Sequence, residues 1–274
     1  MKAMILAAGL GTRLRPLTND RPKALVEVAG RTLLEIALSR LRAFGVREVI
    51  VNVHHFGDGV ADYLQKHGNF GMRIEISREE ILLDTGGGLQ KAAWFFQEDS
   101  GDLDAPFLLH NVDVLSSIDL NKMVQFHLEH GALATLAVQD RKTSRYLLFD
   151  EANQLCGRRR GDGAPEIVRA SSHSRALAFC GLHVISPRML PMMTETGVFS
   201  IVDTYLRLAE QGKEIIAFRA DDYYWRDLGK PENIAQAEHD VEQRVVSVEV
   251  TDCTRRLRSR TRRRFVGRPG QAKS

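Results

Sequence analysis

The feature that most constrains this chain is an apolar run that ends in a glycine loop. Residues 3–25 read AMILAAGLGTRLRPLTNDRPKAL, and residues 3–8 form a short apolar run typical of a buried strand. The loop that follows contains Gly9, Gly11, Thr12 and Arg13. Glycines let backbone N–H groups approach a ligand closely, and successive N–H groups form an anion-binding concavity. Because the cations Arg13 and Lys23 accompany this loop, it predicts a triphosphate site.

The residues after the loop predict a parallel sheet. Apolar residues recur at helical spacing over residues 33–44, and residues 46–53 (VREVIVNV) are β-branched and typical of a strand. Strand, helix and strand form a βαβ unit with a right-handed crossover, so an α/β fold is expected. Further strands are expected at 72–77, 106–110, 132–139, 145–150, 176–185 and 214–220.

Polar residues follow two of these elements. Residues 84–88 (DTGGG) predict a second glycine loop that feeds a helix, and the strand at 106–110 ends in Asn111-Val112-Asp113. Ligands of open α/β sheets lie beyond the carboxyl ends of the strands, so Asp113 and the first loop can share one site. Magnesium typically takes one or two protein carboxylates plus phosphate oxygens. Asp113 is therefore a candidate ligand, and Asp227 is a second.

Several common sites are excluded by missing residues. A dinucleotide-binding fingerprint needs a glycine where Leu14 stands, and a P-loop needs Gly-Lys-Ser/Thr where the chain has residues 11–13, Gly-Thr-Arg. The three cysteines lack the spacing of a zinc site or a disulfide framework. The glycine pair alone is also compatible with a simple tight turn, and Glu79-Glu80 is interpreted as a solvated face.

Charge and composition divide the chain in two. Of 274 residues 43% are apolar, enough for a sizeable core, and the longest apolar runs are too short to span a membrane. With no signal-peptide pattern, a cytoplasmic location is expected. Residues 244–274 carry ten Lys and Arg against two acids, +8, so residues 1–243 sum to −5. We expect a folded domain over 1–243 and a flexible basic tail over 244–274, solvated and dispensable rather than bound to nucleic acid or anionic lipid.

The motifs resemble a known family. Residues 6–18 (LAAGLGTRLRPLT), 21–25 (RPKAL) and 28–30 (VAG) closely resemble the signature of sugar-phosphate nucleotidyltransferases, the NDP-sugar pyrophosphorylases. The resemblance continues through residues 84–88, 111–113, 179–181 and 225–229, and so covers residues 1 to about 240. The chain looks most like the short members that act on N-acetylmuramate 1-phosphate or mannose 1-phosphate. The family fold is a Rossmann-like three-layer α/β fold with a mixed, mostly parallel sheet.

The resemblance also implies residue roles. The nucleotide would be held by Ala8, Gly9, Gly11, Thr12, Arg13, Lys23, Thr85, Gly86 and Gly87. Arg13 and Lys23 would neutralise the departing pyrophosphate, Asn111 and Gly181 would contact the substrate, and Asp113 and Asp227 would hold Mg²⁺. The partners would then be an NTP and a sugar 1-phosphate, with an NDP-sugar as a cell-envelope precursor. The chain would act as a monomer or homo-oligomer.

One departure from the family leaves the sugar open. Many relatives carry a Glu-Lys pair before residues 179–181, whereas this chain has Glu166-Ile167-Val168-Arg169 within a polar stretch, 157–174, interpreted as a loop or flap. Arg169, Arg175 or one of Arg158–Arg160 could replace the lysine that binds the sugar phosphate. The alternative function is a catalytically silent relative that senses a nucleotide or nucleotide sugar. The intact set of Arg13, Lys23 and two aspartates argues for catalysis.

Overall fold

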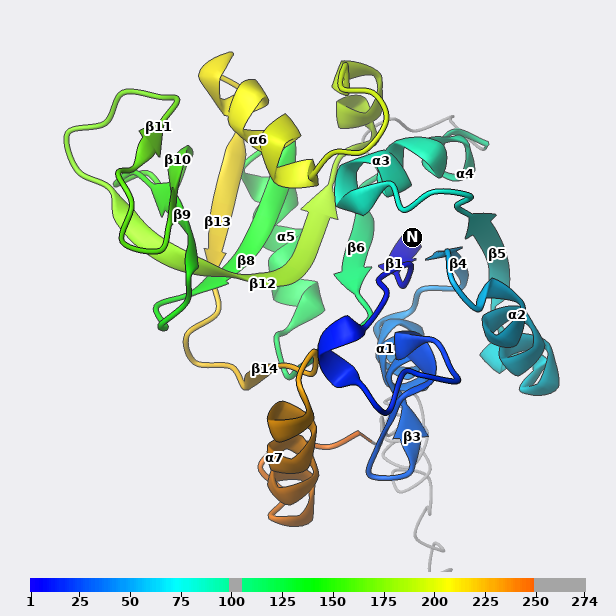
Figure 1. Ribbon diagram of the computed structural model, residues 1–274. Coiled ribbons are helices and arrows are strands. Elements are labelled where there is room, and N and C mark those ends of the chain that lie inside the picture. The colour runs from blue at the N-terminus through cyan, green and yellow to red at the C-terminus, as the bar shows by residue number, and fades with distance from the viewer. Residues whose placement is uncertain (99–104, 249–274) are drawn as a thin grey trace, which may run out of the picture.

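The predicted βαβ unit is present and lies toward one edge of the main sheet. The computed structural model describes residues 1–98 and 105–248 (Figure 1). Strand β1 (Lys2–Leu6) leads through the glycine loop to α1 (Leu33–Phe44), which returns to β4 (Glu48–Val53). Strands β1 and β4 pair in parallel, with Ala3 opposite Val49. Thr32 caps α1 by accepting a hydrogen bond from the Glu35 N–H, and Gly45, at φ 103°, ends it.

The mixed central sheet is confirmed. Within the described residues the main sheet has ten strands, in the order β11-β10-β9-β12-β6-β1-β4-β5, with β8 and β13 joined through β12. Parallel pairs form β6-β1-β4-β5 and β8-β13, whereas β12 pairs antiparallel with β6, β8 and β9. The remaining strands are β5 (Arg73–Arg78), β6 (Phe107–Asn111), β8 (Ala134–Gln139), β9 (Arg145–Phe149), β10 (Leu155–Arg160), β11 (Glu166–Ile167), β12 (Arg175–Ile185) and β13 (Ile215–Arg219).

Helices cover both faces of the sheet, which makes three layers (Figure 1). On one face lie α1, α2 (Gly57–Lys66) and α5 (Leu120–Glu129), and α7 (Pro231–Glu242) extends the same apolar core beyond the main sheet, beside residues 225–227. On the other lie α3 (Asp84–Lys91), α4 (Ala93–Gln97) and α6 (Ile201–Glu210). Alternation along β1 sends Ala3 and Ile5 into the first core and Met4 into the second. The α/β fold is therefore held by a separate apolar core on each side.

Two predicted loops are wrong. Residues 157–160 continue β10, and Glu166–Ile167 return as β11 to pair with it. Gly157 permits this pairing, because a Cβ there would lie 2.3 Å from the Glu166 carbonyl oxygen. The second glycine loop, in turn, is the first part of α3. A Cβ on Gly86 would lie 2.3 Å from the Phe199 ring, so close packing rather than a loop requires that glycine.

The described end of the chain packs against the domain. Val246 and Val248 are buried and belong to the core on the α1 side. Two short ladders complete the structure, β2 (Glu27–Val28) with β3 (Arg31–Thr32) and β7 (Val114–Ser116) with β14 (Trp225–Asp227). The rest of the predicted tail, residues 249–274, lies outside the described residues. Of the helices described, none has the length and apolar character needed to cross a membrane.

Three buried histidines predict acid sensitivity. Burial lowers the pKa of His110 and His183 to about 3 and that of His127 to about 4, so the folded state holds all three neutral. Their stabilising effect is complete above the unfolded pKa of about 6.5 and is lost as the pH falls. From pH 6.5 downward, the free energy of unfolding should fall by about 1.4 kcal/mol per pH unit for each histidine.

Urea unfolding at pH 7.0, 6.0 and 5.5 checks this expectation. His127→Gln should make the dependence on pH shallower by the share of one histidine. His130→Asn, at an exposed position, should leave the slope as it is in the unmodified protein. A free energy of unfolding that stays constant across this range would contradict the expectation.

Candidate active site

A cavity opens at the carboxyl ends of β1 and β6. Its volume is about 510 Å³. The predicted site residues that line it are Ala8, Gly9, Arg13, Lys23, Thr85, Asn111 and Asp113. They come from three separate stretches of the chain. Parallel pairing of β1 with β6 brings the first loop and residues 111–113 to the same edge of the sheet, and Thr85 follows β5, a further strand of the same parallel set. The structure thus places the first loop, Asn111 and Asp113 around one space.

The first loop is fixed by its own residues. Gly11 has φ +64°, a left-handed conformation that favours glycine, and it begins a single helical turn over Thr12–Leu14. The Thr18 hydroxyl donates to the Gly11 carbonyl oxygen at 2.9 Å, and a Cβ on Gly11 would lie 2.9 Å from Thr18 Cγ2. Gly11 and Thr12 shape the turn and are not among the residues that line the cavity. Thr18, to which the sequence assigned no role, is the residue that fastens the loop.

The two candidate metal ligands meet through the short β7–β14 ladder. Asp227 lies opposite Val114, the residue after Asp113, and the Leu228 N–H donates to the Asp113 carbonyl oxygen at 2.8 Å. A Cβ on Gly229 would lie 2.6 Å from both Arg13 Nη2 and Asp227 Oδ1, so these groups approach the same glycine. The pairing therefore places the backbones of two aspartates that lie far apart in the sequence next to each other, although Asp227 is not among the residues that line the cavity.

Lys23 and Asp113 form a largely buried ion pair at the wall of the cavity. The Lys23 ammonium forms an ion pair with the Asp113 carboxylate, and their side chains are only 13% and 15% exposed. The Asn111 Oδ1 atom is buried and has no hydrogen-bond partner within the described structure. A buried acceptor of this kind is costly unless a ligand satisfies it. The cavity therefore offers cations, carboxylates and an unused acceptor to one ligand.

These oxygen donors fit Mg²⁺. In the described ranges no group of three or more His, Cys, Asp or Glu residues could hold a metal ion. A dedicated protein cage is not what Mg²⁺ requires, because it usually takes one or two carboxylates and completes its shell with phosphates and water. Asp113 and Asp227 provide that number of carboxylates beside a loop suited to phosphates.

The second glycine segment is arranged differently from the first. Thr85 lines the cavity, and its hydroxyl accepts from the Ile201 N–H at 3.0 Å. The N–H groups of Gly86 and Gly87 both donate to the Phe199 carbonyl oxygen, at 3.0 and 3.3 Å. These glycines let α3 pack against the segment before α6. Their contact with a nucleotide stays a prediction.

A buried hydrogen-bond chain links two walls of the cavity. The Ala7 N–H donates to Asn52 Oδ1, and the Asn52 amide donates to Glu79 Oε1, each at 2.7 Å. Glu79 Oε2 then accepts from the Leu83 N–H at 2.9 Å, just before α3. Glu79 is 4% exposed, so its interpretation as part of a solvated face is wrong. Asn52 and Glu79 were missed because neither stands in a motif; an asparagine at a strand end was the only signal.

Gly181 lies behind Asn111 and allows a precise test of this wall. It has φ +71°, and a Cβ there would lie 2.8 Å from Asn111 Nδ2. We expect Gly181→Ala to lower the free energy of unfolding by about 1–3 kcal/mol, through backbone strain and displacement of Asn111. Gly59→Ala, in open space on α2, is the matched control and should raise it by about 0.5–1 kcal/mol. Urea unfolding measures both, and equal effects of the two variants would contradict this role of Gly181.

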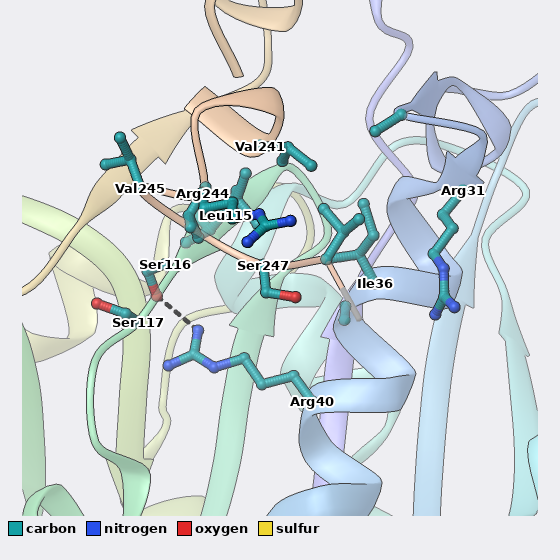
Figure 2. Close-up of a pocket in the computed structure, with 15 residues that line it drawn as sticks. Arg31, Ile36, Arg40, Leu115, Ser116, Ser117, Val241, Arg244, Val245 and Ser247 are labelled. Carbon is teal, nitrogen blue, oxygen red and sulfur yellow. Dashed lines mark hydrogen bonds between the residues drawn. The ribbon is translucent and has the colours of Figure 1, made fainter. Parts of the chain in front are cut away.

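A second, larger cavity of about 820 Å³ lies away from the strand ends, between α1, β7 and residues 241–248 (Figure 2). None of the predicted site residues lines it. Figure 2 shows Arg40 reaching from α1 toward Ser116, to whose hydroxyl it donates at 2.5 Å, and it also donates to the Ile118 carbonyl oxygen. Burial lowers the pKa of Arg40 to about 10. Arg40 thus ties α1 to β7, the strand that follows Asp113.

The comparisons with known proteins identify the family of this chain. The nucleotidyl transferase family model matches residues 2–150. The chain is 34% identical over 249 residues to the N-acetylmuramate alpha-1-phosphate uridylyltransferase of Caulobacter vibrioides, covering 86% of this chain and 95% of that protein. It is 30% identical over 237 residues to the mannose-1-phosphate guanyltransferase of Candida albicans, covering 85% of this chain but only 62% of that longer protein. The UTP–glucose-1-phosphate uridylyltransferase of Synechocystis sp. is 28% identical, again with 62% of its length covered.

Solved structures share the fold. A UDP-glucose pyrophosphorylase complexed with UDP-glucose has a TM-score of 0.71 at 18% identity, covering 89% of this chain and 98% of that one. HddC from Yersinia pseudotuberculosis, complexed with GMP-PN, has a TM-score of 0.68 at 20% identity, covering 87% and 98%. The three-layer α/β fold predicted from the resemblance is therefore confirmed. The family model and the Caulobacter relative together show that this chain belongs to the nucleotidyl transferase family.

Proposed function

We propose that this protein transfers a nucleotidyl group from an NTP to a sugar 1-phosphate, giving an NDP-sugar and pyrophosphate. The observation that carries the proposal is that Arg13, Lys23 and Asp113 line one cavity at the carboxyl ends of β1 and β6, while the β7–β14 ladder places the Asp227 backbone next to that of Asp113. Family membership and relatives named for sugar 1-phosphate substrates support it. Such a cavity suits a reaction in which phosphate charge must be held and moved.

In this reaction an oxygen of the sugar 1-phosphate attacks the α-phosphorus of the NTP. The bond from the α-phosphorus to the bridging oxygen breaks, and pyrophosphate leaves with that electron pair. Because the nucleophile is already an anion, no general base is needed. Arg13 and Lys23 neutralise charge on the departing pyrophosphate, and the first loop orients the phosphates. Mg²⁺, held by Asp113 and Asp227, would supply further charge neutralisation when bound.

One experiment tests the proposal directly. Purified protein with Mg²⁺ is incubated with a grid of NTPs against sugar 1-phosphates, and pyrophosphate is measured. Release with at least one pair, dependent on both substrates, is the expected result. Tight NTP binding without release from any pair would instead favour the silent sensor. A cytoplasmic location, a monomeric or homo-oligomeric state and supply of product to the cell envelope stay predictions.

A further inference from the structure

A second chamber continues from the proposed nucleotide cavity. Its volume is about 460 Å³, and it shares Asp84, Thr85 and Asn111 with the first cavity. Strands β9 and β10 contribute one wall, which we call the arginine wall. Its basic residues are Arg145, Arg158, Arg159 and Arg160. Asp84 is the one acidic residue among the lining residues, and His183 is neutral because burial lowers its pKa to about 3. The chamber therefore carries an excess of positive charge.

Only one of these arginines is neutralised within the described parts of the chain. Arg158 forms ion pairs with Glu166 at 2.6 Å and Asp203 at 2.5 Å, which also hold β11 and α6 against β10. No carboxylate of the described residues lies within ion-pair distance of Arg145, Arg159 or Arg160. Two of the candidates left open by the sequence, Arg169 and Arg175, are not among the residues that line either cavity.

The arrangement on the two strands concentrates this charge. Arg160 stands directly opposite Arg145 in the antiparallel register, on the same face of the sheet. Like charges in directly opposed positions are destabilising, so an anion between them would relieve a real repulsion. Arg159, opposite Tyr146, alternates to the other face of the sheet and lies over the Tyr146 ring at 4.9 Å, so Arg145 and Arg160 are the pair that one anion can meet. The wall is thus prepared for an anionic group.

We propose that the arginine wall selects sugar 1-phosphates that carry a carboxylate, which Arg145 and Arg160 bind. This inference rests on the proposed function. The reacting 1-phosphate must meet the NTP in the first cavity, whose lining includes none of the four arginines. The 1-phosphate therefore does not neutralise the positive charge of the arginine wall. A guanidinium presents paired N–H donors that match a carboxylate. N-acetylmuramate 1-phosphate, named in the Caulobacter relative, is such an acid, whereas mannose 1-phosphate and glucose 1-phosphate are not.

Two substrates that differ only in this charge provide the test. Values of kcat/KM are measured for N-acetylmuramate 1-phosphate and for its carboxyl methyl ester, with the preferred NTP. The unmodified protein should prefer the acid by at least about 10-fold. Arg145→Gln/Arg160→Gln should lower kcat/KM for the acid by about 10- to 100-fold and leave the ester nearly unchanged. Arg145→Lys/Arg160→Lys should retain part of the preference.

Arg219→Gln is the matched control, because Arg219 is an exposed arginine at the end of β13, paired with Asp221 and outside both cavities. It should leave both substrates unaffected. Equal losses for acid and ester in the double glutamine variant would assign the pair a structural role and overturn the proposal. The proposal would also be overturned if the unmodified protein had the same kcat/KM for the acid and the ester.

The failure of this inference can be told apart from that of the proposed function. Pyrophosphate release from sugar 1-phosphates that lack a carboxylate, without a preference for the acid, would contradict the carboxylate proposal and still support the transferase function. With no release from any pair, the transferase fails, and calorimetric titration of acid and ester into the unmodified and double-variant proteins still measures selection. Equal affinities would then overturn the role of the arginine wall.

Discussion

Asp113→Asn is expected to lower the rate of pyrophosphate release by about 10³-fold while the protein stays folded. Asparagine keeps the shape of the side chain, but it removes the negative charge that faces Lys23 and would hold Mg²⁺. Asp227→Asn should have a similar effect, because β14 pairs Asp227 with Val114, the residue after Asp113, and Asp227 is the second proposed ligand. Saturating both substrates and Mg²⁺ makes kcat the measured quantity, and urea unfolding checks the fold.

Combining the two substitutions sharpens this expectation. If the carboxylates hold one metal ion, each variant alone already loses that site. Asp113→Asn/Asp227→Asn should then be little slower than either single variant, since residues that act as a unit are strongly non-additive. Fully multiplicative losses would contradict a shared metal ion. Near-normal turnover in either single variant would contradict the metal site itself.

Arg13→Ala should lower kcat by about 10²- to 10³-fold with a much smaller change in KM for the sugar phosphate. The Arg13 side chain lines the cavity and approaches Gly229, where its charge is available to the departing pyrophosphate. Arg13→Lys should recover part of the rate, because an ammonium keeps the charge but not the planar fork. Steady-state kinetics with pyrophosphate as the readout measures both variants.

The same segment supplies a matched control. Arg21 is exposed, and its partner is the neighbouring Asp20 at 3.1 Å. Arg21→Ala should therefore leave kcat and KM unchanged. A loss in Arg21→Ala as large as that in Arg13→Ala would show that overall positive charge, not the placement of Arg13, sets the rate.

The site was predictable where topology alone brings residues together. The first loop and Asp113 each follow a strand, and parallel pairing of β1 with β6 is enough to place them side by side. Asp227 was found only through the family resemblance and its unusual surroundings. No local pattern marks the three residues of β14 as a strand, because they are only half-buried and their partner is remote in sequence.

Other features depend on contacts that no local pattern records. In the sequence Glu79 resembles an ordinary surface acid, but in the fold it is buried and accepts hydrogen bonds from the Asn52 amide and the Leu83 N–H. Gly86 and Gly87 look like part of a loop in the sequence, yet they lie in a helix and pack closely against Phe199 and Gly197. Strand β10 was not predicted, because its consecutive arginines disrupt the alternation of apolar and polar residues by which strands are recognised.

The β7–β14 ladder also affects when the active site can be completed during synthesis on the ribosome. Domains are built from the N-terminus as the chain emerges, so the phosphate loop and Asp113 leave the ribosome long before Asp227. A nascent chain that ends soon after Asp113 already contains β1, β4, β5 and β6, but the proposed magnesium site would then lack Asp227. With the proposed metal ligands, nucleotidyl transfer would begin only after the chain past Leu228 is free to pair. Truncated chains released by interrupted synthesis would therefore not consume NTP.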